Sequence, residues 1–256
     1  RRTDEAVIVR FNDQEAIRAV PYDIPGTGYH NDKVNTLRLW SSEPSAHYEA
    51  CQDGNGGCEI TIGHKKSLEA ITDVLYPDDS TAEGKELRIK QQYLLVSAGL
   101  QSILRKHMRD KRLDELPNYV AIHINDTHPA LAVPELMRLL LDEHHVSWEE
   151  AWDITTSTLS YTNHTVLPEA LEKWSVAIFR TVLPRIYQLV EEINERFCRE
   201  LWHRYPGDWE RIAQMAVISN DHVNMAHLAI VGSYSVNGVA ELHTGILKHQ
   251  VMTHFY

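Results

Sequence analysis

Two short polar segments of this chain hold the side chains that are best suited to chemistry. Asn125-Asp126-Thr127-His128 follows an apolar run, and Asn163-His164-Thr165 stands beside an apolar run and a proline. In α/β proteins ligands bind where the carboxyl ends of the strands meet, so we expect both segments to line one cleft. A carboxylate at Asp126 could there hold the ring of His164 through one nitrogen and fix its tautomer.

The histidines also allow a metal site. His123, Asp126, His128 and His164 are residue types that bind zinc or manganese, and such a site would make the protein a metal-dependent hydrolase. The period of two along a strand argues against it, because His123 would then point away from Asp126. A hydrogen-bonded polar cluster that binds no ligand fits the same spacing. The spacing alone leaves these alternatives open.

Charged residues mark both ends of a long helix predicted over residues 85–107. The acidic turn 78–84 precedes it, and Arg105 and Lys106 stand in its last turn. Both charge clusters complement the helix dipole, which is the simpler interpretation. The functional alternatives are a gate that repels phosphate at the acidic end and a regulatory phosphate site at the basic end, which Arg38 could join.

Tryptophans offer a further alternative, a glycan-binding module without catalysis. Trp40, Trp148, Trp152 and Trp174 could stack against sugar rings. Tryptophans serve more often as packing residues, whose apolar bodies are buried while the indole N–H finds a partner.

Composition excludes several classes of protein. The 256 residues carry a net charge of -11, which argues against nucleic acid or an anionic membrane as the main partner. No apolar run approaches the length that spans a bilayer. Cys51, Cys58 and Cys198 make an odd count without metal-like pairing, which indicates a reducing compartment such as the cytoplasm. The first residue is not methionine, and we expect the chain to be a piece of a longer protein.

The order of predicted elements is that of an α/β protein, a β-rich start followed by long helices and a few buried strands. Pro21 and Pro25 are expected to form turns between the first strands, and Asn237-Gly238 a loop after a last apolar strand. Ser147 begins a capping box and Asp208 a further helix cap. The predicted strands are 6–9, 17–20, 34–40, 119–124 and 225–231, and the predicted helices are 67–76, 85–107 and those beginning near Pro134, Ser147, Pro184 and Asp208.

Longer motifs in the chain resemble those of the α-glucan phosphorylases, the family of glycogen, starch and maltodextrin phosphorylases. The motifs follow one another over nearly the whole chain in the family's order. They are Val20-Pro21-Tyr22-Asp23, Val34-Asn35-Thr36-Leu37-Arg38-Leu39-Trp40-Ser41, Val74-Leu75-Tyr76-Pro77, Glu83-Gly84-Lys85-Glu86-Leu87-Arg88, residues 124–129 with Pro134-Glu135-Leu136-Met137, residues 161–172, Asn224-Met225-Ala226-His227-Leu228 and Val236-Asn237-Gly238-Val239-Ala240.

The resemblance implies a two-lobed glycosyltransferase with a partial Rossmann-like lobe of the GT-B type. Residues 1–256 would be a single partial domain of the N-terminal lobe, without the C-terminal lobe. Inorganic phosphate would cleave the terminal α-1,4-linked glucose of a glucan to glucose 1-phosphate with retained configuration. The implied cofactor is pyridoxal 5'-phosphate, whose lysine lies in the absent lobe, so the chain alone is expected to be inactive. The parent protein is expected to be a homodimer, although residues 51–64 are poor helix formers where relatives have a subunit-contact helix.

The resemblance also assigns roles to single residues. The catalytic residues would be His164 beside the anomeric centre, Asp126 orienting its ring, and Asp79 in a gate loop. The residues that line the substrate pocket would be His128, Thr165, Asn237 and Val239. The residues matching positions for phosphorylated effectors would be Arg38, Arg105 and Lys106.

Overall fold

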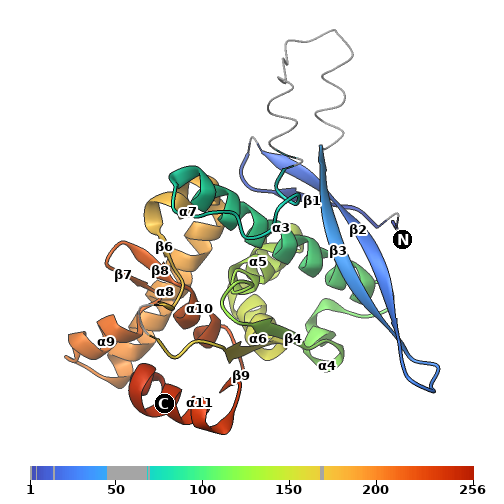
Figure 1. The fold of residues 1–256 in the computed structure, drawn as a ribbon. Coiled ribbons are helices and arrows are strands. Elements are labelled where there is room, and N and C mark those ends of the chain that lie inside the picture. Colours follow the sequence, from blue (N-terminus) through green and yellow to red (C-terminus); the bar gives the residue numbers. More distant parts are fainter. Residues whose placement is uncertain (1, 4, 14, 45–67, 69, 168–169) are drawn as a thin grey trace. The chain divides into compact units, whose positions relative to one another are not determined.

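The computed structural model describes residues 2–3, 5–13, 15–44, 68, 70–167 and 170–256. It divides into two compact units, Arg1–Ser102 and Ile103–Tyr256. One antiparallel sheet belongs to the first unit, and one parallel and one antiparallel sheet belong to the second (Figure 1). Cys51, Cys58 and the predicted absence of a subunit-contact helix over 51–64 lie outside the described residues.

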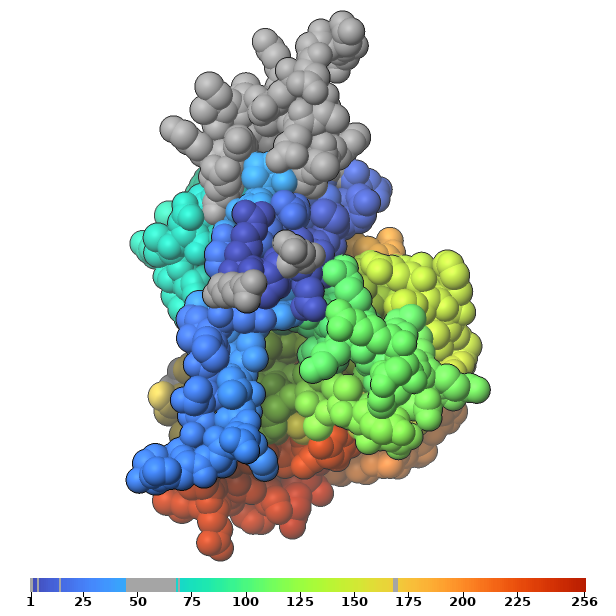
Figure 2. All heavy atoms as spheres, turned by 90° about the vertical axis from the view of Figure 1, so that its right-hand side faces the viewer, coloured from blue at the N-terminus to red at the C-terminus, as the bar shows by residue number. Residues whose placement is uncertain are grey.

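The sheet of the first unit is a meander of β1 (Val7–Arg10), β2 (Ala16–Thr27) and β3 (Val34–Pro44). All three predicted strands form, but β2 runs on to Thr27 instead of ending near Val20. Beyond β1, the ribbon of β2 and β3 continues as a narrow arm (Figure 2). Its turn is closed by the Gly28 N–H, which donates to the Lys33 carbonyl at 2.9 Å.

Pro21 and Pro25 lie inside β2, so the prediction that they form turns is wrong. They pair with Trp40 and Thr36 of β3. The ladder between β1 and β2 reaches only Ala19. Beyond it, the N-terminal residues lie along β2, since Arg2 bridges to Tyr22 and the Thr3 N–H donates to the Pro21 carbonyl at 3.1 Å. Neither proline lies within the β1–β2 ladder, so that ladder loses no hydrogen bond through the missing proline N–H.

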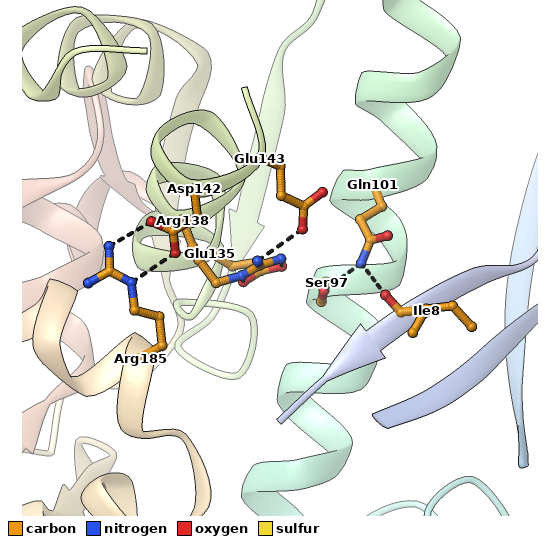
Figure 3. A network of polar contacts seen from close by, with 8 residues as sticks. All are labelled: Ile8, Ser97, Gln101, Glu135, Arg138, Asp142, Glu143 and Arg185. Carbon is orange, nitrogen blue, oxygen red and sulfur yellow. Dashed lines mark hydrogen bonds and ion pairs between the residues drawn. The ribbon is translucent and has the colours of Figure 1, made fainter. Parts of the chain in front are cut away.

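Helix α3 (Ala82–His107) confirms the predicted long helix. Thr81 begins it, since its hydroxyl accepts the Gly84 N–H at 3.0 Å. Within the first unit, Gln101 Nε2 donates to the Ile8 carbonyl of β1 at 2.9 Å (Figure 3). Of the helix predicted over 67–76, the described residues 70–76 form turns and bends instead.

The parallel sheet of the second unit has the order β4 (Ile122–Asn125), β5 (Leu159–Asn163) and β9 (Ser235–Gly238). The strand expected over 119–124 begins only at Ile122, after helix α4 (Leu116–Tyr119), and pairs in parallel with β5. Its burial alternates: Ile124 is 1% exposed, whereas its neighbours on the other face are exposed. One face of this sheet is therefore core and the other is polar in the described part of the chain.

The other helices of the second unit follow one another along the chain. They are α5 (Ala132–Arg138) continuing as the π-helix η2 (Leu139–Glu143), α6 (Trp148–Thr158), α7 (Val176–Val182), α8 (Pro184–Arg204), α9 (Trp209–Met215), α10 (Met225–Val231) and α11 (Glu241–Ile246), with the 3-10 helices η1 (Leu113–Glu115) and η5 (Thr253–Phe255) and the π-helix η4 (Leu247–Val251). The second sheet has the order β6 (Lys173–Ser175), β8 (His222–Asn224) and β7 (Ile218–Ser219).

Local sequence explains where several of these helices begin. The Ser147 hydroxyl accepts the Glu150 N–H at 3.3 Å, which is one of the two hydrogen bonds of the predicted capping box, and Asp208 accepts the Arg211 N–H at 3.1 Å. Both residues are therefore N-caps. The run Met225–Val231 forms α10 rather than the predicted strand, and the predicted loop at Asn237-Gly238 is the end of β9.

Three ion pairs connect residues of α5, η2 and α8 (Figure 3). Arg138 donates to both carboxylate oxygens of Glu135, at 2.8 and 2.9 Å, and also to Glu143. The Glu135 side chain is fully buried. Arg185 of α8 forms the same bidentate pair with Asp142, at 2.8 and 2.7 Å, but on the surface.

None of the helices in the described part of the chain has the length and apolar character that a membrane span needs.

Candidate active site

The candidate site lies at the carboxyl edge of the parallel sheet. β4 ends at Asn125, β5 at Asn163 and β9 at Gly238, and the residues that follow each strand meet at this edge because the strands are parallel. The sequence predicted this convergence for the segments after β4 and β5. It did not predict that β9 adds Asn237 as a strand residue beside Thr162.

The ring of His164 is held by Asn125. Its Nε2 lies 2.8 Å from Asn125 Oδ1, and an amide oxygen only accepts, so Nε2 carries the proton. Asn125, and not Asp126 as predicted, is the hydrogen-bond partner of the ring. The ring's Nδ1 has no partner among the described residues and remains available to a ligand hydroxyl.

Asp126 is turned away from the strand by its backbone. Its φ angle is 66°, in the left-handed region that aspartate tolerates, and its N–H donates to the Thr162 carbonyl at 3.0 Å. Its carboxylate accepts the Thr127 N–H at 2.7 Å. This turn explains the changed partner of His164, because it redirects the carboxylate just beyond the strand. His128 lies in the turn that follows.

Thr165 is positioned by the buried end of β5. Its N–H donates to Asn163 Oδ1 at 2.8 Å, and Asn163 Nδ2 donates to the Tyr161 hydroxyl at 2.8 Å. Asn163 and Tyr161 are fully buried. Burial raises the pKa of the Tyr161 phenol, and the nearby Asp126 carboxylate adds to this rise. The phenol is therefore a neutral structural group that fixes the loop carrying Thr165.

Asn237 and Val239 are held from two directions. Asn237 Oδ1 accepts from the Thr162 hydroxyl at 3.0 Å, while the Val239 N–H donates to His243 Nδ1 at 3.2 Å. Between them, Gly238 packs so closely on α11 that a Cβ would lie 3.0 Å from the Thr244 backbone nitrogen. A glycine is needed for this approach.

Asp79 belongs to the first unit, in the turn before α3. Its carboxylate forms an ion pair with Arg88 and remains 45% exposed. The preceding Asp78 accepts the Ser80 N–H at 2.9 Å, which lowers the pKa of Asp78. Gly84 closes the turn, since a Cβ there would lie 1.8 Å from the Asp78 carbonyl oxygen. The gate role of Asp79 remains a prediction.

The guanidinium of Arg38 is hydrogen-bonded to side chains of the first unit. It holds both oxygens of Asp23 at 2.8 Å, Glu5 at 2.9 Å and the Ser102 hydroxyl at 2.7 Å. Hydrogen bonding from Arg38 lowers the pKa of Asp23, so the pair stays charged. A phosphate would have to displace these carboxylates. Arg105 and Lys106 are exposed in the last turn of α3, and their effector role remains a prediction.

The proposed metal ligands do not come together. Among the described residues no group of three or more histidine, cysteine, aspartate or glutamate side chains could hold a metal ion. His123 is bound instead by Ser160 and Thr162, and His164 by Asn125. The metal-dependent hydrolase using His123, Asp126, His128 and His164 is therefore not supported by the arrangement of these side chains.

Two of the tryptophans line a surface hollow of about 770 Å³ between α6 and α8. Arg196 covers Trp148 at 4.5 Å and is itself paired with Glu192 and Glu149. Trp174 is 5% exposed and is a core residue. Of the four predicted platforms, Trp148 and Trp152 line this hollow, and the face of the Trp148 ring is covered by Arg196.

Sequence reasoning placed Asn125 in the first polar segment but gave no role in the site to Asn125, Thr162 or His243. Asn125 and Thr162 could have been found from strand register, since residues at alternate positions of adjacent strands share a face. His243 has no comparable signal, because its contact with Val239 depends on how α11 folds back on β9.

Comparisons with known proteins agree with the arrangement of the motifs. The family model for carbohydrate phosphorylase matches residues 1–256. A glycogen phosphorylase of Bacillus subtilis (strain 168) is 56% identical over 99% of this chain, and glycogen phosphorylase 2 of Dictyostelium discoideum is 47% identical over 97%. The muscle form of glycogen phosphorylase from Ovis aries is 44% identical over 96%. The chain spans 31%, 26% and 31% of the length of these three relatives. This chain belongs to the carbohydrate phosphorylase family.

Proposed function

We propose that this chain is part of the N-terminal lobe of an α-glucan phosphorylase with the two-lobed GT-B fold. The full-length protein would transfer the terminal α-1,4-linked glucose of a glucan to inorganic phosphate, releasing glucose 1-phosphate with retained configuration. Membership of the family supports the reaction class. The observation in this chain that carries the proposal is the His164 ring, fixed by Asn125 at the strand edge with Nδ1 unoccupied.

The strand-edge residues would bind and orient the glucosyl unit. His164 Nδ1 can accept a sugar hydroxyl, and the main-chain dipoles after β5 can face the positive charge that develops at the anomeric carbon. Asn237, Val239, Thr165 and His128 would line the same pocket. Such groups act because they are held in place before the substrate arrives, and the hydrogen bonds to Thr162, His243 and Asn163 provide that support.

Pyridoxal 5'-phosphate is the expected cofactor. A lysine amine would hold it, and its phosphate would supply acid–base chemistry when bound. The strand-edge residues named above include no lysine. We therefore place the cofactor's lysine and main phosphate ligands in the C-terminal lobe, and assign the chain only glucan binding and orientation. We also propose a cytoplasmic homodimer, and an inactive chain when residues 1–256 are produced alone.

The test uses the full-length protein with pyridoxal 5'-phosphate, maltoheptaose and inorganic phosphate. We expect phosphate-dependent release of glucose 1-phosphate, and a loss of about 10- to 100-fold in kcat/KM for His164→Ala, the usual effect of losing one or two positioned hydrogen bonds. His203→Ala, at the exposed end of α8, is the matched control and should keep wild-type activity.

Two results would contradict the proposal. The first is release of free glucose that does not depend on phosphate, which would indicate a hydrolase. The second is full-length, cofactor-loaded protein that forms no glucose 1-phosphate above a blank.

A further inference from the structure

A chain of hydrogen bonds crosses the polar face of the parallel sheet. His123 Nε2 on β4 lies 2.8 Å from Thr162 Oγ1 on β5, which lies 3.0 Å from Asn237 Oδ1 on β9. The register accounts for it, because Thr162 is paired with Asn237 and with Asn125, and His123 is two residues before Asn125 on the same face.

The direction of each hydrogen bond follows from the chemistry of its two ends. Asn237 Nδ2 lies 2.8 Å from the Gly238 carbonyl oxygen, which can only accept, so this end of the amide must be the NH₂ group. Its oxygen therefore faces Thr162 and accepts the hydroxyl proton. A hydroxyl has one proton, so His123 Nε2 must donate to the Thr162 oxygen.

The other nitrogen of the His123 ring is compatible with this direction. Nδ1 lies 3.1 Å from the Ser160 hydroxyl, which can donate to a neutral ring or accept from a charged one. Nε2 carries a proton in either case. The donor chain from His123 to Thr162 to Asn237 therefore persists whatever the charge of the ring.

We propose that His123 is a positioning residue for the amide of Asn237 and acts on it through Thr162. This inference rests on the proposed function, in which Asn237 contacts the glucosyl unit. The exposed amide keeps one N–H and one oxygen lone pair for a ligand, and the Gly238 carbonyl and the Thr162 hydroxyl together fix which end each occupies. Without the hydrogen bond from Thr162, the amide would be held at its nitrogen alone, and its oxygen would be less firmly placed for a sugar hydroxyl.

The first test is a double-mutant cycle in the full-length protein, with maltoheptaose as the glucan. We expect His123→Ala and Thr162→Val each to raise KM for the glucan about tenfold and leave kcat within about twofold, the signature of lost ground-state binding. The double variant should be no worse than either single variant, because both remove the same chain. His123→Gln and Thr162→Ser, which keep a donor at each place, should recover most of the affinity.

The inference would be overturned if His123 and Thr162 acted independently, which would raise KM of the double variant about a hundredfold. It would also be overturned if His123→Gln and Thr162→Ser raised KM as much as the Ala and Val variants do. Unchanged KM in both single variants would also overturn it. Melting temperatures measured alongside separate positioning from a general loss of folding.

The second test does not depend on activity. Nitrogen NMR of full-length protein labelled with ¹⁵N-histidine should show the His123 ring with its proton on Nε2, and Thr162→Val should shift the ring toward the Nδ1–H form, because valine cannot accept. A wild-type ring protonated only on Nδ1 would overturn the inference. If the full-length protein shows no phosphorolysis, the proposed function fails, and this spectrum alone decides the role of His123.

Discussion

Two polar regions of the second unit use hydrogen bonds in opposite ways. In α5, the side chain of Glu135 is fully buried, and Arg138 donates a hydrogen bond to each of its carboxylate oxygens. On the sheet face, the bonds that join His123, Thr162 and Asn237 leave an amide N–H and a lone pair unused and exposed. In the first region both carboxylate oxygens are hydrogen-bonded within the protein, as a buried ion pair requires when it is taken out of water. In the second region the hydrogen bonds fix the Asn237 amide but leave part of it exposed, which is what a ligand site requires.

The largest expected effect of this contrast is on stability. Glu135→Ala leaves the mostly buried Arg138 without its main partner, and breaking such a pair costs about 3–5 kcal/mol of unfolding free energy. The measurement is equilibrium unfolding in urea. The control is Asp142→Ala, which breaks the equally well-formed pair with Arg185 on the surface and should cost less than about 1 kcal/mol. Equal losses in the two variants would show that burial does not distinguish the pairs.

The sequence predicted the parts of the fold that depend on neighbouring residues. Ser147 and Asp208 are caps whose hydrogen bonds reach three residues along the chain, and both are present. The meeting of the segments after β4 and β5 was also predictable, because it follows from parallel strands. The location of the candidate site therefore came from the sequence.

The features that were missed depend on contacts distant in the sequence. Pro21 lies in β2 beyond the ladder with β1, which reaches only Ala19, and nothing near Pro21 indicates how far that ladder extends. The run 225–231 is apolar enough for a buried strand or a buried helix, and its length does not decide between them. The partner of His164 changed from Asp126 to Asn125 because one residue adopts a positive φ angle, which moves a carboxylate off the strand face.

A smaller effect tests how rigidly the open region is held. Gly238→Ala would place a methyl group 3.0 Å from the Thr244 nitrogen and 3.1 Å from His243 Cγ, so β9 or α11 must shift. Overpacking of this kind costs about 1–3 kcal/mol, measurable by urea unfolding. Gly245→Ala is the matched control in α11, where the added methyl group meets nothing within 4 Å, and alanine should stabilise the helix by up to about 1 kcal/mol. Loss of stability in the control, or none in Gly238→Ala, would contradict the assigned packing.

The smallest expected effect concerns His227, whose side chain is partly buried. His227 donates from Nδ1 to the Ala216 carbonyl at 2.9 Å and packs on Phe255, with ring centres 5.0 Å apart. Burial lowers the pKa of His227 below its ordinary value of 6.5, and the charge of Lys173 lowers it further. Below pH 6.5 His227 is therefore protonated in the unfolded chain before it is protonated in the folded chain. The unfolding free energy is unaffected by this group above pH 6.5 and falls as the pH drops toward the folded pKa, by at most about 1.4 kcal/mol per pH unit.

His227→Gln removes this titration and keeps an N–H for the Ala216 carbonyl. Unfolding free energies measured between pH 7.5 and 5 should fall less steeply for this variant than for the wild type, and the two curves should differ in slope only below about pH 6.5. His203→Gln replaces an exposed histidine and should retain the wild-type slope. Identical slopes for the wild type and His227→Gln would mean that the partly buried ring binds its proton without loss of stability. Burial would then not distinguish the titration of His227 from that of an exposed histidine.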